Sequence, residues 1–172
     1  SNDTLIGSVN AIKKDSENNI WIGSERGLAR YSTEDQSFMR FSKSNGYPVS
    51  EVFGILEDNA YNLWVSTYTG LVKIKNIIKD TTDIKYRVFD HDDGLQSKQF
   101  NYNAYYKCKS GEMVFGGING FNTFFPDKII ENDVPPNVML TDLRIFNTSV
   151  PIGKEVNGHI VLNKSISVTD EI

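Results

Sequence analysis

The sequence predicts an all-β protein built from repeated four-stranded sheets, and three observations lead to this prediction. Landmarks of unlike chemistry recur at a constant spacing. Short runs of alternating apolar residues are separated by turns rich in Asn, Asp and Gly. No segment keeps apolar residues at helical spacing over three turns, which argues against helical repeats.

The first two repeat units share an aspartate, a tryptophan and a glycine in the same order. Each of these residues recurs 43 positions later, as Asp15 and Asp58, Trp21 and Trp64, and Gly27 and Gly70. Three unlike landmarks at one spacing are not expected by chance, so we interpret the units as copies of one structural motif.

The third unit is a degenerate copy. Gly120 follows Gly70 by 50 positions rather than 43, which indicates an insertion of seven residues. Val114 takes the place of the tryptophan, and Cys108 takes the place of the aspartate. We still expect this unit to form a sheet, because its alternation and its turn glycine remain.

Each unit predicts four short strands. An Asx-rich turn joins the first two strands, and a two-residue connection leads from the second strand to a glycine with positive φ. Four-stranded units of about 40–45 residues are typical of propeller blades. We therefore expect a partial β-propeller of three four-stranded blades. Trp21 and Trp64 are expected to fill the space between adjacent sheets, and Gly27, Gly70 and Gly120 to serve the backbone alone.

The pattern changes after Phe124, where prolines break any strand ladder. A stretch from Val138 to Phe146 then alternates like a strand, and too few residues follow for a complete sandwich of about 100 residues. We expect the chain to stop within this second domain. The predicted boundaries are 1–2 for a cloning scar, 3–46 and 47–94 for two blades, 95–127 for a degenerate last blade, 128–137 for a Pro-containing linker, and 138–172 for the truncated start of an immunoglobulin-like β-sandwich.

Composition excludes several classes of function. The 172 residues carry a net charge of −4 without a basic stripe, so a nucleic acid is not an expected partner. One cysteine and two histidines exclude a disulfide framework and a multi-histidine metal site. No apolar run approaches the roughly 20 residues of a membrane span. We expect no cofactor and no metal.

Two segments, residues 19–28 and 62–71, resemble the regulator-propeller repeat of two-component sensors. Residues 93–101 and 116–122, followed by Phe125-Pro126, resemble the last blades before the C-terminal β-sandwich of that family, the triple-tyrosine domain. Pro135-Pro136 and the strand after them resemble the first strand of that domain.

The resemblance implies a hybrid two-component system of the kind best known in gut Bacteroidetes. In such a receptor this chain would be part of the periplasmic, ligand-sensing ectodomain of an inner-membrane protein. It would detect glycan-derived oligosaccharides and so regulate polysaccharide-utilisation genes. The histidine kinase, membrane span and DNA-binding parts would lie outside these residues, and the fragment itself would be non-catalytic.

Strand order predicts where a ligand could bind. In a four-stranded blade, the loop between strands two and three shares a face with the connections between blades. Loops on one face of a rigid scaffold are the usual place for recognition, arginine can bind acidic sugars or carboxylates, and tyrosine can stack on a sugar. The candidate ligand-binding residues are Glu25, Arg26, Tyr47, Tyr68, Thr69 and Asn119.

The densest polar cluster, residues 90–94, combines three aspartates with His91 and Gly94. A calcium loop would also need a bidentate acid after the glycine, and position 99 is Gln. We interpret the cluster as a solvated loop between blades.

Two further hypotheses stay open. The chain could be a propeller lyase or hydrolase of the streptogramin-lyase type, although the loops suit hydrogen bonding better than proton transfer. It could also be a purely structural segment for signal relay or dimerisation. Because an open arc of three blades leaves two apolar faces uncovered, we expect self-association through the propeller edges or the sandwich domain.

Overall fold

The computed structural model describes residues 7–130, 142–156 and 158–161. The chain divides into two compact units, residues 1–129 and 130–172. The described residues form an all-β fold with only three short 3-10 helices, as the sequence predicts. None of these helices is long and apolar enough to cross a membrane.

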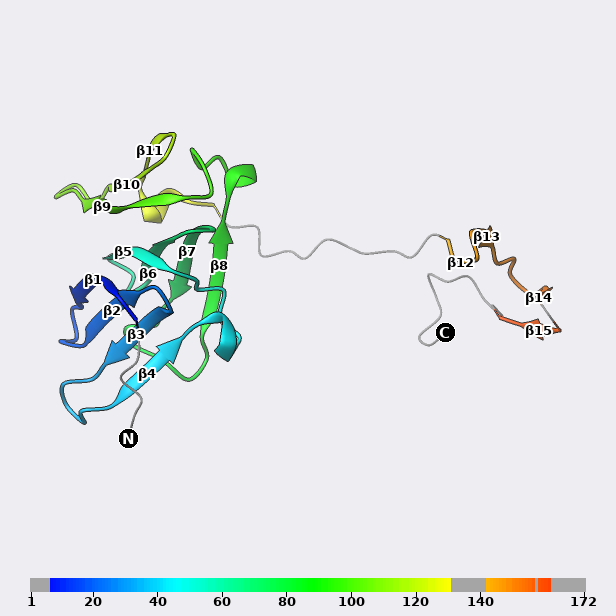
Figure 1. The fold of residues 1–172 in the computed structure, drawn as a ribbon, viewed down its shortest axis with the longest axis horizontal. Helices are drawn as coiled ribbons and strands as arrows, with labels where there is room; N and C mark the ends of the chain where they lie inside the picture. Colours follow the sequence, from blue (N-terminus) through cyan, green and yellow to red (C-terminus); the bar gives the residue numbers. More distant parts are fainter. Residues whose placement is uncertain (1–6, 131–141, 157, 162–172) are drawn as a thin grey trace. The chain divides into compact units, whose positions relative to one another are not determined.

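The first two blades are four-stranded antiparallel sheets whose strands pair in chain order. Blade one contains β1 (Val9–Lys14), β2 (Ile20–Ser24), β3 (Gly27–Tyr31) and β4 (Phe38–Phe41). Blade two contains β5 (Val52–Glu57), β6 (Leu63–Thr67), β7 (Gly70–Lys75) and β8 (Lys85–Phe89). The repeat of the sequence is therefore a repeat of whole sheets (Figure 1).

Blade three differs from the expected four strands. Within the described residues it has three, β9 (Phe100–Lys107), β10 (Met113–Gly117) and β11 (Gly120–Phe124). Pro126 follows directly and begins a 3-10 helix, η3 (Pro126–Lys128). Proline has no backbone N–H for a strand ladder and fits the first turn of a helix, so the chain leaves the sheet here.

A tight turn with one glycine joins the second and third strands of each blade. Gly27 and Gly70 have φ angles of 120° and 136°. A Cβ at these positions would meet the carbonyl oxygens of Phe41 and Phe89 at 2.6 and 2.3 Å. Both the backbone conformation and the close approach of the fourth strand therefore require glycine.

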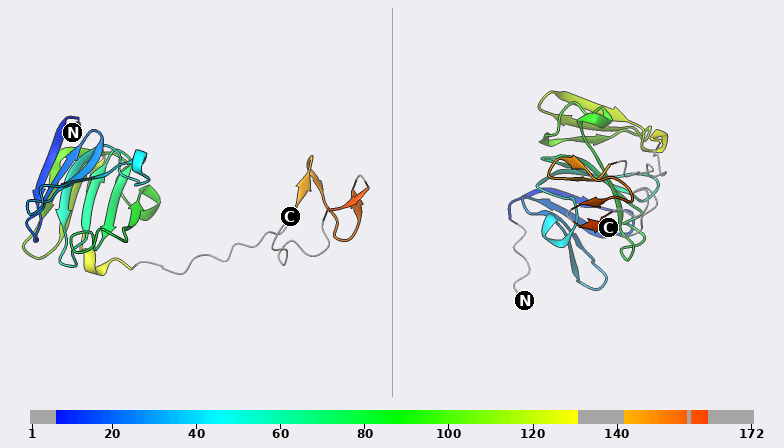
Figure 2. Two further views of the ribbon diagram at one scale, coloured as in Figure 1. Left: turned by 90° about the horizontal axis from the view of Figure 1, so that it is seen from below. Right: turned by 90° about the vertical axis from the view of Figure 1, so that its right-hand side faces the viewer.

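The core lies between the sheets, which follow one another as layers in the right-hand view of Figure 2. The innermost strands β1, β5 and β9 bring the layers together. Trp21 is fully buried in the cluster that joins blades one and two, and Trp64 is fully buried in the cluster that joins blades two and three. Each tryptophan packs on the aromatic ring that ends the fourth strand of its own blade, Phe41 or Phe89.

In the part of the second unit that the structure describes there are two short hairpins, β12 (Arg144–Ile145) with β13 (Thr148–Ser149) and β14 (Glu155–Val156) with β15 (His159–Ile160). Of the sandwich strand expected over residues 138–146, residues 138–141 fall outside the described residues, and β12 occupies two of the remaining five positions.

Candidate ligand-binding site on the loop face

The turns after the second strands lie at the same end of the three blades. In each blade, a backbone hydrogen bond joins this turn to the residue just before the innermost strand. The backbone amide of the turn donates to a carbonyl oxygen there: Glu25 to Ser8 (3.1 Å), Tyr68 to Glu51 (3.3 Å) and Ile118 to Gln99 (3.4 Å). This repeated bond holds the turns in equivalent positions, and we define the end of the blades that carries them as the loop face.

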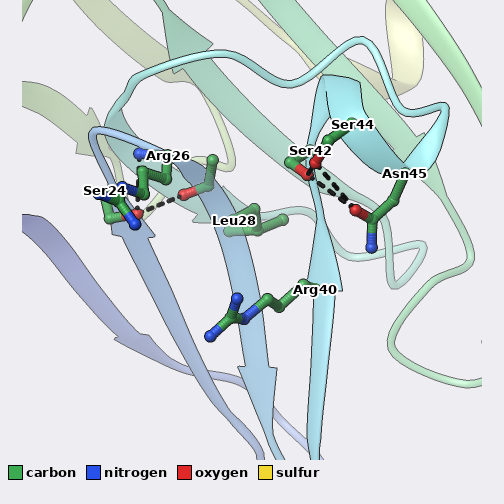
Figure 3. A pocket seen from close by; sticks show the side chains of 8 residues that line it. Ser24, Arg26, Leu28, Arg40, Ser42, Ser44 and Asn45 are labelled. Carbon is green, nitrogen blue, oxygen red and sulfur yellow. Dashed lines mark hydrogen bonds between the residues drawn. The ribbon is translucent and has the colours of Figure 1, made fainter. Parts of the chain in front are cut away.

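A pocket of about 230 Å³ lies on blade one at the loop face. Two chain segments form it: the β2–β3 turn, and the segment from the end of β4 into η1 (Lys43–Asn45). Figure 3 shows the two segments on either side of Leu28, with Arg40 between them. The lining residues are Ser24, Arg26, Gly27, Leu28, Arg40, Ser42, Ser44 and Asn45.

Hydrogen bonds fix both walls of the pocket. On one side, the Ser24 hydroxyl donates to the carbonyl oxygen of Gly27 (3.1 Å) and accepts from the amide of Arg26 (3.2 Å). On the other side, the hydroxyls of Ser42 and Ser44 lie 2.8 Å apart, and both donate to Asn45 Oδ1 (3.2 and 3.0 Å). The amide nitrogen of Asn45 points away from these hydroxyls (Figure 3). It remains a donor for a ligand.

Arg40 carries a hydrogen-bonding capacity that the described residues do not use. It lies on β4 opposite Ala29 of β3. Its Nη2 atom is buried without a hydrogen-bond partner. A buried cationic donor without a partner costs free energy. A ligand acceptor at this place would remove that cost.

The six predicted ligand residues are distributed over the loop face. Of these six, Arg26 alone is among the described residues that line the pocket. The other five do not line it. Glu25 accepts from the backbone amide of Ser8 (3.5 Å), and Tyr47 packs on the Phe41 ring with 5.1 Å between centroids. Tyr68 and Thr69 are exposed on the blade-two turn, and the backbone amide of exposed Asn119 donates to Gln96 Oε1 (2.8 Å). Sequence reasoning missed Arg40, because it considered only loops and Arg40 is a strand residue.

A glutamate and a tyrosine connect blades two and three near the loop face. The hydroxyl of Tyr102 donates to Glu51 Oε1 at 2.6 Å. This hydrogen bond to the carboxylate raises the pKa of Tyr102 above its ordinary value. Tyr102 therefore stays a neutral donor rather than acting as a base.

The aspartates of the cluster at residues 90–94 serve the local backbone. Asp90 caps η2 (His91–Asp93) by accepting from the amide of Asp92, and Asp93 accepts from the amide of Asp90. Asp93 also pairs with Arg87 at 3.0 Å, and His91 Nδ1 lies 3.1 Å from the carbonyl oxygen of Leu95. Across residues 7–130, 142–156 and 158–161, no group of three His, Cys, Asp or Glu side chains could hold a metal ion.

Sequence reasoning also missed a buried carboxylate network that recurs in blades one and two. In blade two, Asp58 Oδ1 accepts from the amides of Ala60 and Asn62, both at 2.9 Å. Its Oδ2 accepts from Asn62 Nδ2 (2.7 Å) and Trp64 Nε1 (2.9 Å). Asp15, Asn19 and Trp21 form the same network in blade one.

The network orients the interface tryptophan from the turn between the first two strands, which is the opposite end of each blade from the loop face. A signal for it was present in the sequence. The spacing Asp-x3-Asn-x-Trp occurs in both units, and the third unit lacks the aspartate and the tryptophan together. Because the aspartate and the tryptophan are kept together in two units and lost together in the third, we infer that they act as one structural unit.

The described residues define a β-propeller fold, with repeated antiparallel sheets and a buried tryptophan in each interface between blades. Residues 5–26 match the family model described as "Two component regulator propeller". This match includes most of the motif at residues 19–28, so it confirms the resemblance of that segment to the regulator-propeller repeat.

One relative in sequence is "Histidine kinase P4" of Formosa agariphila, which is 40% identical over 128 residues. The match covers 74% of this chain and 9% of the kinase, so this chain corresponds to a small part of that protein.

Solved structures share the fold. The extracellular domain assigned to the hybrid two component system BT3049 of B. thetaiotaomicron superposes with a TM-score of 0.62 at 24% identity, covering 86% of this chain and 21% of that chain. The extracellular domain assigned to the one component system BT4673 of the same organism gives a TM-score of 0.58 at 18% identity, covering 74% and 19%. At these identities the comparison establishes the shared fold alone.

Proposed function

We propose that this chain is part of the periplasmic, ligand-sensing ectodomain of a hybrid two-component sensor anchored in the inner membrane. Its blades bind glycan-derived oligosaccharides at the loop face, and binding regulates polysaccharide-utilisation genes through a histidine kinase elsewhere in the receptor. The kinase relative and the extracellular domains with the same fold support this proposal.

The pocket on blade one is the observation that carries the binding part of the proposal. Its side chains offer guanidinium, hydroxyl and amide groups, which are the groups that hydrogen-bond sugar hydroxyls. The described lining includes no carboxylate or imidazole that could act as a general base. The chemistry of the pocket therefore favours binding over turnover.

The experiment is a binding screen of the 172-residue chain against oligosaccharides from plant, algal and host glycans, by isothermal titration calorimetry. We expect at least one glycan to bind, and Ser42→Ala to weaken its binding. Lys109→Ala, which changes an exposed lysine on blade three, is the control and should leave affinity unchanged. Absence of binding across the screen would favour the relay hypothesis, and turnover that disappears in His91→Ala would favour the lyase hypothesis.

A further inference from the structure

The pocket on blade one has a positive charge that its fold does not require. Arg26 and Arg40 both line it, and no aspartate or glutamate is among its described lining residues. Glu25, the acidic neighbour in the same turn, directs its carboxylate to the amide of Ser8 instead. An anion entering the pocket would therefore meet the guanidinium groups of both arginines.

Arg40 is the cation of this pocket whose hydrogen bonding is incomplete. Its Nη2 is buried and has no hydrogen-bond partner, so part of the guanidinium is desolvated without compensation. A planar guanidinium matches a carboxylate or a sulfate through paired hydrogen bonds. The amide nitrogen of Asn45 adds a neutral donor beside it.

Blade two provides an internal comparison, because the same sheet is built there without the cations. Ala29 pairs with Arg40 in blade one, and Val72 pairs with Val88 in blade two. The repeat also places Thr69 where blade one has Arg26. The residues after β8 that correspond to Ser42, Ser44 and Asn45 are all acidic: Asp90, Asp92 and Asp93. The same backbone therefore carries opposite charge, and the arginines are not needed to form a blade.

We propose that the pocket on blade one binds the anionic group of an acidic sugar, either a uronate carboxylate or a sulfate ester. Its volume of about 230 Å³ is below the ~300–1,000 Å³ of sites that hold drug-sized ligands. One charged monosaccharide unit fits that size better than a whole oligosaccharide. The sugar part of this inference rests on the proposed function, whereas the anion part stands on the pocket alone.

The test uses the 172-residue chain with glucuronate, glucose 6-sulfate and glucose at constant ionic strength, followed by NMR chemical-shift changes and calorimetry. We expect at least one charged sugar to bind at least tenfold more tightly than glucose, with shifts at residues 24–28 and 40–45. Preference between the two charged sugars identifies the anion. Inorganic sulfate, as a further probe, should displace the charged sugar.

Arg40→Val and Arg26→Thr introduce the residues of blade two, so both variants are compatible with the fold. Each should weaken binding of the charged sugar at least tenfold, whereas Lys109→Gln removes one positive charge from blade three and should not. Arg40→Lys should restore part of the affinity, because it keeps the charge without the planar fork.

Equal affinity for glucose and the charged sugars would overturn the anionic inference and leave the proposed function standing. Unchanged affinity in Arg40→Val, with shifts elsewhere, would also overturn it. Binding of inorganic sulfate with no shift from any sugar would support the anion site and contradict the sugar part.

Discussion

Replacing Asp58 by Asn tests whether the buried carboxylate network holds blade two together. The substitution keeps the size of the side chain. Its Oδ1 can still accept from the amides of Ala60 and Asn62. Its new NH₂ group, however, faces two donors, Asn62 Nδ2 and Trp64 Nε1, which the carboxylate accepts at 2.7 and 2.9 Å.

The magnitude follows from those two donors. Trp64 is fully buried and Asn62 is 9% exposed, so water cannot replace the lost acceptor easily. A buried donor left without a partner costs about 1–3 kcal/mol. Since Asn62 can partly reorient, we expect Asp58→Asn to lower the free energy of unfolding by about 3 kcal/mol. Asp15→Asn should cause a similar loss, because blade one repeats the network.

Urea unfolding followed by circular dichroism of the strands measures this loss. Trp64→Phe removes the indole N–H that donates to Asp58. In a chain that already carries Trp64→Phe, Asp58→Asn should therefore lower the free energy of unfolding by about 1–2 kcal/mol less than it does in the wild-type chain. Cys108→Ala is the control in blade three, where a backbone bond from Cys108 to Glu112 (2.8 Å) closes the turn without a carboxylate. It should change stability by about 0.5 kcal/mol or less. An Asp58→Asn loss below about 0.5 kcal/mol, or strict additivity with Trp64→Phe, would refute the reasoning.

Three further predictions concern the turns, the pH dependence and the outer faces. Gly70→Ala should lower the free energy of unfolding by at least about 2 kcal/mol in thermal denaturation, because φ is 136° and the new Cβ would lie 2.3 Å from a backbone oxygen of β8; an unchanged melting temperature would contradict this. Hydrogen bonds from the hydroxyls of Ser32 and Ser37 lower the pKa of Asp35 from 3.8 to about 2. The contribution of this carboxylate to stability is therefore complete above about pH 4 and is lost as the pH falls towards 2. An NMR titration of the carboxyl group measures the pKa, and Ser37→Ala should move it back upwards. A wild-type pKa near 3.8 would contradict the assignment. The chain should self-associate in sedimentation experiments, and Ile12→Lys should reduce this, because Ile12 is 67% exposed on the outer face of blade one; a monomer at all concentrations would contradict it.

Much of the blade architecture was predictable because it depends on local, repeated residues. The recurrence of Trp21 and Gly27 as Trp64 and Gly70 marks the second strand and the turn that follows it, and the structure has both. The three strands that blade three has within the described residues, in place of four, were not predicted. The change depends on Pro126, whose effect on a fourth strand is visible only when the pairing of β11 is known.

The candidate site was predictable only in part. The position of Arg26 at the site could be predicted, because the turns after the second strands share one face of the blades. Arg40 does not, since its place in the pocket depends on the register that sets it opposite Ala29. A strand arginine in a sequence is ordinarily interpreted as a solvent-facing residue, and its buried, unpartnered Nη2 becomes visible only in three dimensions.

The positions of the two tryptophans give the domain a built-in optical reporter. The sequence contains two tryptophans, and each is sealed into a different interface between blades. Trp64 also lies beside Phe124 at the end of β11, with 4.8 Å between ring centroids. The fluorescence of a variant that retains Trp21 alone would follow the contact between blades one and two, and that of a variant that retains Trp64 alone the contact between blades two and three. A ligand that loosens or tightens one of these interfaces would change the emission wavelength of the tryptophan in it. The affected interface could thus be identified without any added label.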